Sequence, residues 1–296
     1  MKLSKLSTAI LVATAAISAP AFATPITTDI ISVVDESGSM GGEHAWLGGM
    51  ISALDSELAT AAGADAFNAQ YGLVGFGGSS SSSHYTGHAH DMDAGTAGTQ
   101  EFGSAAQYAT ATGSLVLSGS REDGYSGIDT ALGYTGQANS VTNIILVTDE
   151  NRDVVDGSLN YNAIDAALAG KNALLNAVLN VRVKCGDNTA ALGMDSSGTG
   201  YQADGNGGFT TCSGAYNSSG TSSWNDYGTL ALATGGAVWD LNQLRAGGLT
   251  ADSFTAAFVD IKVQETIDHS TVPEPASLAL LGLGLAGFGA RRKFAK

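Results

Sequence analysis

The chain has 296 residues, of which 44% are hydrophobic, and this suits one large domain. It carries 28 acidic and 13 basic residues, which gives a net charge of −15 at pH 7. So negative a chain argues against nucleic acid or anionic lipid as a partner. Forty glycines and few charged side chains favour an exported bacterial surface protein over a cytosolic enzyme.

Residues 1–23 have the layout of a secretory signal peptide. Lys2 and Lys5 supply a positive start, and an apolar stretch runs over residues 8–17. The small residues Ala21 and Ala23 then form a small-x-small cleavage site. A buried N-terminal helix is the alternative. We expect the mature chain to begin near Thr24.

Strand and helix patterns alternate over the middle of the chain. Strands are expected at 28–34, 69–76, 141–148, 178–184 and 237–240, and helices at 44–62, 104–112, 126–134, 161–175, 224–233 and 251–263. An insertion rich in His, Ser and Gly occupies residues 77–98. This alternation predicts an α/β domain over residues 24–268, with a doubly wound, mostly parallel central sheet and helices on both faces.

The first apolar strand ends abruptly at Asp35, and two hydroxyl residues, Ser37 and Ser39, follow it on a tight loop. A carboxylate and two hydroxyls are hard oxygen ligands, which Mg²⁺, Mn²⁺ and Ca²⁺ prefer. A turn that merely caps the next helix would use the same residue types.

Two further polar loops are expected at the same edge of the sheet, because ligands of open α/β sheets bind at the carboxyl ends of the strands. Asp149 ends the apolar strand 141–148, and Ser126 lies in the loop before a short helix. The adjacent carboxylates of Asp123 and Glu150 could add to the rim. Together with Asp35, these residues predict a divalent cation site.

These motifs resemble the von Willebrand factor type A (VWA) domain. The matching pieces are Asp35-Glu36-Ser37-Gly38-Ser39, the loop before Ala131-Leu132, the run Ile144-Ile145-Leu146-Val147-Thr148-Asp149, and Ala233-Thr234-Gly235-Gly236 before a strand. The resemblance implies a metal-ion-dependent adhesion site (MIDAS) formed by Asp35, Ser37, Ser39, Ser126 and Asp149. Mg²⁺ is the expected ion, with Mn²⁺ and Ca²⁺ as alternatives. The chain departs from the family at Glu150, where Gly is usual, and in the insertion 77–98.

A second metal site is a weaker hypothesis. His84, His88, His90 and Asp91 crowd into the insertion, and His and Asp side chains can bind Zn²⁺. The neighbouring Ser and Gly residues are equally typical of a solvated loop.

The two cysteines, Cys185 and Cys212, predict one disulfide that closes a loop rich in Gly, Asp and Ser. A disulfide is the simplest interpretation in an oxidising compartment. A metal or catalytic role for two lone cysteines is the alternative.

The C-terminal segment 272–296 reads Val272-Pro273-Glu274-Pro275, then an apolar helix over 276–290, then Arg291-Arg292-Lys293. Fifteen apolar residues give about 22 Å of helix, short of a bilayer core of ~30 Å. The segment resembles the PEP-CTERM sorting signal of Gram-negative bacteria. That resemblance implies transient membrane insertion through 276–290, recognition by an exosortase, and export to the cell surface or extracellular polymer matrix. An ordinary single-span anchor is the alternative.

The motifs of common enzymes are absent from the sequence. It contains no nucleophile elbow between a strand and a helix, no His-Glu-x-x-His and no phosphate-binding Gly-Lys-Ser/Thr loop. We therefore expect a binding module rather than an enzyme, one that uses its metal to bind a protein or matrix ligand offering a carboxylate or other oxygen. The alternatives are a structural matrix protein whose metal only stabilises it, and a hydrolase that uses His84, His88 and His90.

Overall fold

The computed structural model describes residues 26–63, 67–78 and 85–270. The expected signal peptide of residues 1–23 and the expected sorting helix of residues 276–290 lie outside the described residues. Within the described ranges, no helix is long and apolar enough to cross a membrane.

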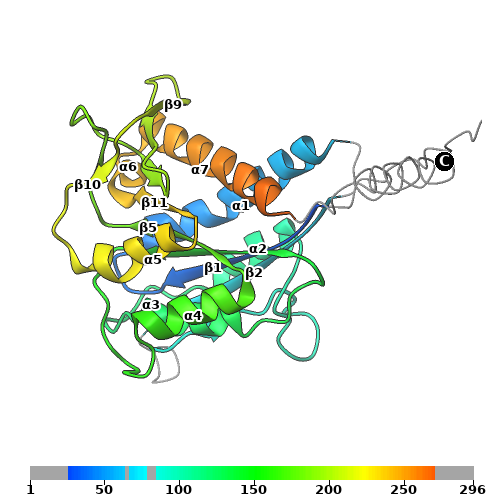
Figure 1. The fold of residues 1–296 in the computed structure, drawn as a ribbon. Coiled ribbons are helices and arrows are strands. Elements are labelled where there is room, and N and C mark those ends of the chain that lie inside the picture. The colour runs from blue at the N-terminus through cyan, green and yellow to red at the C-terminus, as the bar shows by residue number, and fades with distance from the viewer. Residues whose placement is uncertain (1–25, 64–66, 79–84, 271–296) are drawn as a thin grey trace, which may run out of the picture. The chain divides into compact units, whose positions relative to one another are not determined.

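A nine-stranded sheet forms the centre of the described domain, in the order β3-β2-β1-β4-β5-β11-β7-β8-β9. Figure 1 shows strands of this sheet, among them β1, β2 and β5, with helices on both sides. Five central strands are parallel: β2 (Phe67–Phe76), β1 (Ile26–Asp35), β4 (Val141–Thr148), β5 (Leu174–Leu179) and β11 (Ala237–Asp240). Antiparallel strands extend both edges: β3 (His88–Ala89) on one side, and β7 (Gly193–Asp195), β8 (Gly200–Ala203) and β9 (Phe209–Cys212) on the other. The predicted α/β fold with a large central sheet is confirmed, and the extension β7–β9 was not predicted.

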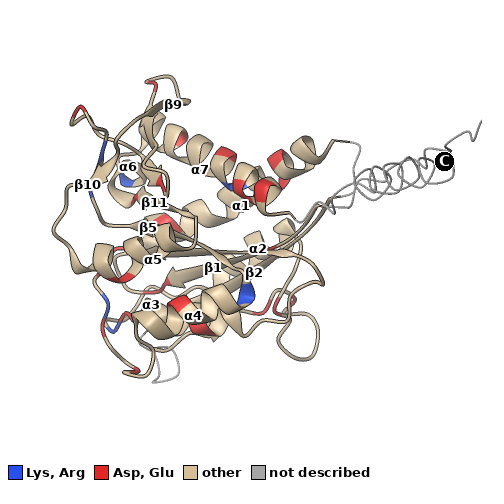
Figure 2. Cartoon of the chain, in the orientation of Figure 1, with Lys and Arg blue, Asp and Glu red and all other residues tan. Residues whose placement is uncertain are grey.

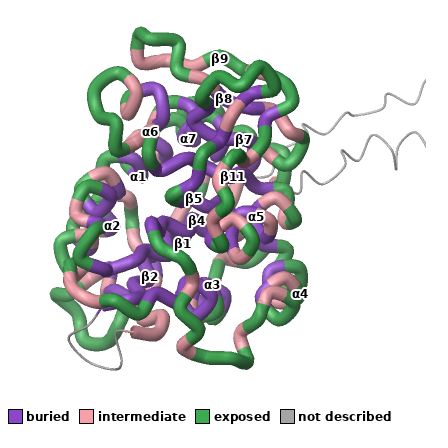
Figure 3. Tube along the Cα trace, turned by 90° about the vertical axis from the view of Figure 1, so that its left-hand side faces the viewer, coloured by how far each residue is buried: buried purple, intermediate pink, exposed green. Residues whose placement is uncertain are grey.

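Helices cover both faces of this sheet. One face carries α3 (Gly124–Leu132), α4 (Tyr161–Lys171), the π-helical turn η3 (Trp224–Gly228) and α5 (Thr229–Ala233). The other carries α1 (Gly41–Ala62), α2 (Ala105–Ala111), the short turn η2 (Thr112–Ser114), α6 (Leu241–Arg245) and α7 (Gly248–His269). Alternation along β1 fills both cores, because Ile31 and Val33 face the first layer and Ile30 and Val34 the second. The central strands are accordingly buried (Figure 3).

The helix expected over 161–175 ends earlier, at Lys171. Asn172 caps it in the left-handed conformation, with φ of 50°. The chain then enters β5 at Leu174, four residues before the predicted start of that strand. Apolar Leu174 and Leu175 fit a helical period as well as a strand, so the pattern alone did not place the boundary.

The predicted disulfide is present between Cys185 and Cys212. It joins the segment after β6 (Val183–Lys184) to the end of β9, and β6 pairs with β10 (Tyr216–Asn217) in a separate two-stranded sheet.

Acidic residues are spread over the helices and loops of the domain, and basic residues are few (Figure 2).

Candidate metal centre

Asp35 is fully buried at the carboxyl end of β1 and is held from both sides. The backbone N–H of Ser37 donates to its Oδ1 over 2.8 Å, and the hydroxyl of Thr148 donates to its Oδ2 over 2.8 Å. A ring nitrogen of His44, on α1, donates to the carbonyl oxygen of Asp35 over 2.8 Å. The loop after β1 is therefore fixed before any ligand arrives.

Three oxygens from two loops converge beside Asp35. The hydroxyls of Ser37 and Ser39 lie 3.1 Å apart, and the Ser39 hydroxyl donates to Oδ1 of Asp149 over 3.0 Å. In octahedral coordination at about 2.05 Å, neighbouring ligand oxygens lie about 2.9 Å apart. We call the oxygens of Asp35, Ser37, Ser39 and Asp149 the oxygen rim. Since Ser39 is exposed, this rim also opens to solvent. The two oxygen–oxygen separations are close to that ligand spacing.

Glu122 adds a carboxylate that the sequence analysis did not assign to the site. Burial, together with the negative charges of Asp35 and Glu150, raises its pKa to about 8. Burial likewise raises the pKa of Asp35 to about 6. Both shifts report acidic groups crowded into a poorly solvated place, where a bound cation would favour their charged forms.

A guanidinium group lies at the other side of the rim. Arg245, at the end of α6, pairs with Oδ2 of Asp149 over 2.8 Å and with Oε1 of Glu43 over 2.6 Å. Asp149 thus offers Oδ1 to Ser39 and Oδ2 to Arg245. Asp149 therefore already has a positive partner in this arrangement, and a metal ion would compete with Arg245 for it.

The hydroxyl of Ser126 is engaged away from these oxygens. It donates to the carbonyl oxygen of Asp123 over 2.8 Å and accepts from the backbone N–H of Gly87 over 2.9 Å. A hydroxyl oxygen has two lone pairs, so one remains for a cation. Among the described residues, no hydrogen bond joins the Ser126 side chain to Asp35, Ser37, Ser39 or Asp149.

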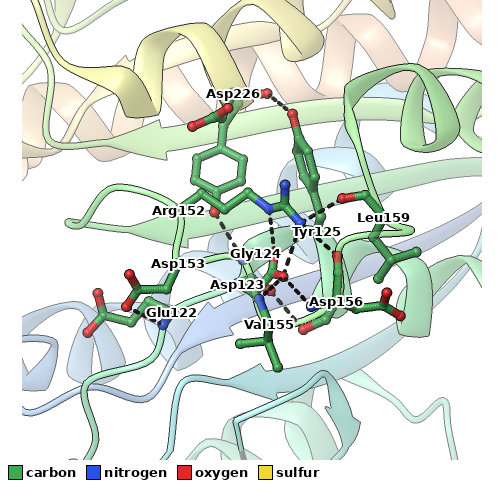
Figure 4. Close-up of polar contacts among 12 residues, drawn as sticks. Glu122, Asp123, Gly124, Tyr125, Arg152, Asp153, Val155, Asp156, Leu159 and Asp226 are labelled. Atoms are coloured by element: carbon green, nitrogen blue, oxygen red, sulfur yellow. Dashed lines mark hydrogen bonds and ion pairs between the residues drawn. The ribbon is translucent and has the colours of Figure 1, made fainter.

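Asp123 has its own partner on the loop that follows Asp149 (Figure 4). Its carboxylate binds Arg152 through two hydrogen bonds of 2.6 and 3.1 Å, and it accepts the backbone N–H of Val155 over 2.9 Å. The Arg152 guanidinium also stacks 4.2 Å above the ring of Tyr125. Asp123 therefore anchors this loop, and its neighbour Glu122 is the acid whose pKa burial and the charge of Asp35 raise.

Glu150 is exposed beside the rim, and its backbone N–H lies 3.4 Å from the Thr148 hydroxyl. Its charge acts on Glu122. The side chain is therefore placed where it can affect a bound cation or a partner.

The histidine-rich insertion forms a separate group. His88 and His90 both lie against Glu36, with Nε2-to-carboxylate distances of 3.0 and 3.3 Å. Asp91 instead accepts the backbone N–H groups of Asp93 and Gln100 within its own loop. His84 lies outside the described residues. Glu36, which the sequence analysis passed over, replaces them as the partner of the two histidines.

The residues that the sequence analysis missed differ in how visible they were. Thr148 and Glu36 stand directly beside predicted ligands, and alternation along a strand could have indicated them. Arg245 comes from a helix 96 residues beyond Asp149 along the chain, and no local pattern connects the two.

Comparisons with known proteins bear on export. Residues 271–293 match the PEP-CTERM protein-sorting motif. The chain carries a PEP-CTERM sorting signal. This signal indicates an exported protein of a Gram-negative bacterium. The resemblance of segment 272–296 to such a signal implied the same. A comparison with curated proteins gives no match.

Several solved structures are similar to part of this chain. They include von Willebrand factor type A from Catenulispora acidiphila (17% identity, TM-score 0.35, 52% of this chain and 33% of that one). Proximal thread matrix protein 1 from the mussel byssus has 15% identity and a TM-score of 0.36, over 52% of this chain and 35% of that one. The SpRpn10 VWA domain has 12% identity and a TM-score of 0.37, over 51% of this chain and 74% of that one. The match spans about a third of the length of the first two chains.

Proposed function

We propose that this protein is an exported VWA-type module that binds a divalent cation through a MIDAS-type site and uses it to hold an oxygen ligand of a protein or matrix partner. Asp35, Ser37, Ser39 and Asp149 form the core of the site, and Ser126 supplies a further hydroxyl. Mg²⁺ is the preferred ion, and Mn²⁺ or Ca²⁺ are the alternatives.

The observation that carries this proposal is the run of oxygens from Ser37 through Ser39 to Asp149, with steps of 3.1 and 3.0 Å. These residues come from loops 110 positions apart in the chain, which β1 and β4 bring to the same edge of the sheet. A capping turn would account for the first loop alone. It would not account for the contact with Asp149.

The chemistry of such a site suits adhesion. Hydroxyl ligands carry no charge, so a cation held mainly by hydroxyls and one or two carboxylates keeps a net positive charge. A solvent-facing position next to Ser39 can then accept a carboxylate from a partner, as in charge-assisted binding generally. The raised pKa values of Asp35 and Glu122 support the proposal, because both groups gain from a nearby cation.

Export completes the proposal. The sorting motif supports processing by an exosortase after transient insertion of residues 276–290 in the membrane, and residues 1–23 would direct secretion. The protein would then act at the cell surface or in the extracellular polymer matrix, where free divalent cations are available.

The test is calorimetric titration of the full-length protein with Mg²⁺, repeated with Asp149→Asn and Ser39→Ala. We expect wild-type binding and a loss of at least about tenfold in affinity for each variant, which is about 1.4 kcal/mol. Asp187→Asn is the matched control, because Asp187 is an exposed acid on the disulfide loop that bonds only within its own turn. Equal Mg²⁺ binding by all four proteins would contradict the site.

A structural matrix protein is the second candidate, and Arg245 and Glu150 favour it. Arg245 already pairs with Asp149, and exposed Glu150 could fill the position that a partner would need. Pull-down from matrix extract in Mg²⁺ and in EDTA separates the two functions. Recovery of partners only with Mg²⁺ supports adhesion, whereas equal recovery, with a lower Tm in EDTA, supports a stabilising metal.

A further inference from the structure

Glu36 follows Asp35 directly, but the two side chains serve different sides of the sheet. Asp35 bonds to Thr148 on β4, whereas Glu36 extends across β2 toward the edge strand β3. His88 lies on β3, and His90 follows that strand directly, two residues further on, so alternation places both side chains on one face. Their Nε2 atoms lie 3.0 Å and 3.3 Å from the two oxygens of Glu36.

The hydrogen bonds of the two imidazole rings fix how they face Glu36. The Ser114 hydroxyl donates its hydrogen to the carbonyl oxygen of Ala111 over 2.6 Å. It must therefore accept the hydrogen bond from Nδ1–H of His90, over 2.7 Å. Nδ1 of His88 lies 3.2 Å from the carbonyl oxygen of Thr86, which can only accept. Both neutral rings therefore present the lone pair of Nε2 to the carboxylate.

Two nitrogen lone pairs that face a buried carboxylate repel it unless a positive species lies between them. His90 is 8% exposed, and its Nε2 has no hydrogen-bond partner in the part of the chain that the structure describes. A ring whose Nδ1–H is anchored and whose Nε2 is directed inward is the usual arrangement of a metal-ligating histidine. The Ser114 and Thr86 contacts would then hold the ligands from behind.

The glycine at position 75 keeps the space between the strands open. A Cβ atom there would lie 2.5 Å from Oε2 of Glu36 and 2.7 Å from Nε2 of His90. Gly75 is on β2, between β1 and β3, and pairs with His88. Glu36 can therefore reach the histidines across β2 only because this position has no side chain.

A cavity of about 320 Å³ adjoins the three side chains. Its remaining wall includes Ala94, Ser114 and Val116. The cluster is thus buried on the sheet side and open on the other, which leaves access for an ion and for one small ligand.

We propose that Glu36, His88 and His90 form a second metal site, specific for a divalent transition metal of the zinc type and separate from the oxygen rim at Asp35. Two imidazoles and one carboxylate favour such an ion over Mg²⁺. At bond lengths of about 2.05 Å, tetrahedral ligands lie about 3.3 Å apart, close to the observed separations. The ligand atoms all fall within 4.8 Å of one another. The fourth position faces the cavity and takes water or a small oxygen ligand.

The test is competition of Zn²⁺ against a chromogenic chelator in the full-length protein, with millimolar Mg²⁺ present to occupy the oxygen rim. We expect one equivalent of Zn²⁺ to bind, and Glu36→Gln and His90→Gln each to weaken that binding by at least about 100-fold. His269→Gln is the matched control, because His269 is exposed at the end of α7. Asp149→Asn should also leave Zn²⁺ binding unchanged, which separates this site from the oxygen rim.

Absence of Zn²⁺ binding by the wild type would overturn the proposal and leave protonated histidines paired with Glu36. Zn²⁺ binding that survives both substitutions would overturn it as well. If the variants do not fold, as shown by circular dichroism, X-ray absorption at the zinc edge of the wild type decides the question. Two imidazoles in the coordination shell support the site, and fewer than two refute it.

Discussion

Asp35 and Glu36 are consecutive residues, yet they lie in surroundings of different chemistry. Asp35 belongs to a rim of carboxylate and hydroxyl oxygens, in which Ser37, Ser39 and Asp149 succeed one another at about hydrogen-bond distance. Glu36 faces two imidazole nitrogens and a backbone N–H, that of Val116 at 2.9 Å. The first side suits a hard cation and the second a transition metal.

This difference follows from the geometry of a strand. Successive side chains point to opposite faces, so the last residues of one strand can serve two layers at once. The oxygen rim relies on β4 as its neighbour, and the histidine side relies on β2 and the short edge strand β3. Two independent sites can therefore share a single loop, and changes on one side should leave the other intact.

The largest expected effect comes from Gly75→Ala. This substitution affects only the histidine side, which is the cluster of Glu36, His88 and His90. The added methyl group would meet Glu36 and His90 at 2.5 to 2.7 Å. Overpacking of this kind costs about 1 to 3 kcal/mol. We expect a lower free energy of unfolding in urea and weaker Zn²⁺ binding, with Mg²⁺ binding retained.

Gly38→Ala is the matched substitution on the oxygen side. Nothing lies within 4 Å of a Cβ atom at Gly38, so this variant should stay within about 0.5 kcal/mol of wild type. Equal stability of the two variants would show that the space beside Glu36 is not closely filled, and would weaken the contrast between the sides.

The second prediction uses pH, because the carboxyl pKa values are raised on the oxygen side and lowered on the histidine side. Burial raises the pKa of Glu122 to about 8 and that of Asp35 to about 6. Burial would also raise the pKa of Glu36, but the close contacts with His88 and His90 and the hydrogen bond from the backbone N–H of Val116 lower it to about 2. A raised carboxyl pKa gives stability at low pH that is lost as pH rises through the folded value, whereas a lowered one gives stability that is lost as the solution becomes acidic.

In EDTA, the Tm should therefore fall as pH rises from 5 to 8, by roughly 3 to 6 °C. Glu122→Gln should flatten the upper part of that profile, while the loss of stability below pH 4.5 that Glu36 causes should persist. A profile in which Glu122→Gln changes nothing between pH 6 and 8 would argue that Glu122 is not crowded by the rim.

The fold centre was predictable because its signals are local. The apolar run 141–148 coincides with β4, and residues 237–240 coincide with β11. Asp35, Ser37, Ser39 and Asp149 follow such strands, so the topology brings them together. The extension β7–β9 was missed because its short strands lie in a loop rich in Gly and Ser, where the disulfide and pairing with β11 supply the order.

The parts of the sites that were not predicted depend on contacts between distant segments. Glu122 and Asp123 cannot be told apart from the sequence. In the structure Asp123 pairs with Arg152 and anchors a loop, whereas the charge of Asp35 helps to raise the pKa of Glu122. Glu36 was hidden as the variable residue of an Asp-x-Ser motif, although its alternation with Asp35 indicates the opposite face. Arg245 reaches the rim from a helix that has no strong pattern of its own.

The smallest effect we predict is that of Arg245→Gln, which acts on the oxygen side alone. Arg245 binds Oδ2 of Asp149 over 2.8 Å. A metal ion at Asp149 must therefore either displace the guanidinium group or bind beside it against the repulsion of like charges. Removing the charge should strengthen Mg²⁺ binding by about three- to tenfold, since partly exposed pairs of this kind contribute about 1 kcal/mol. Calorimetric titration with Mg²⁺ measures the change.

Arg182→Gln is the control for this substitution, because Arg182 is exposed and lies after β5, away from the rim. It removes the same charge from the protein without touching Asp149 or Glu43. If both variants tighten Mg²⁺ binding equally, the effect is that of net charge. If Arg245→Gln weakens binding instead, Arg245 orients Asp149 for the metal rather than competing with it, and the rim depends on α6 as well as on β1 and β4. Zn²⁺ affinity should be unchanged in both variants, because neither arginine contacts the histidine side.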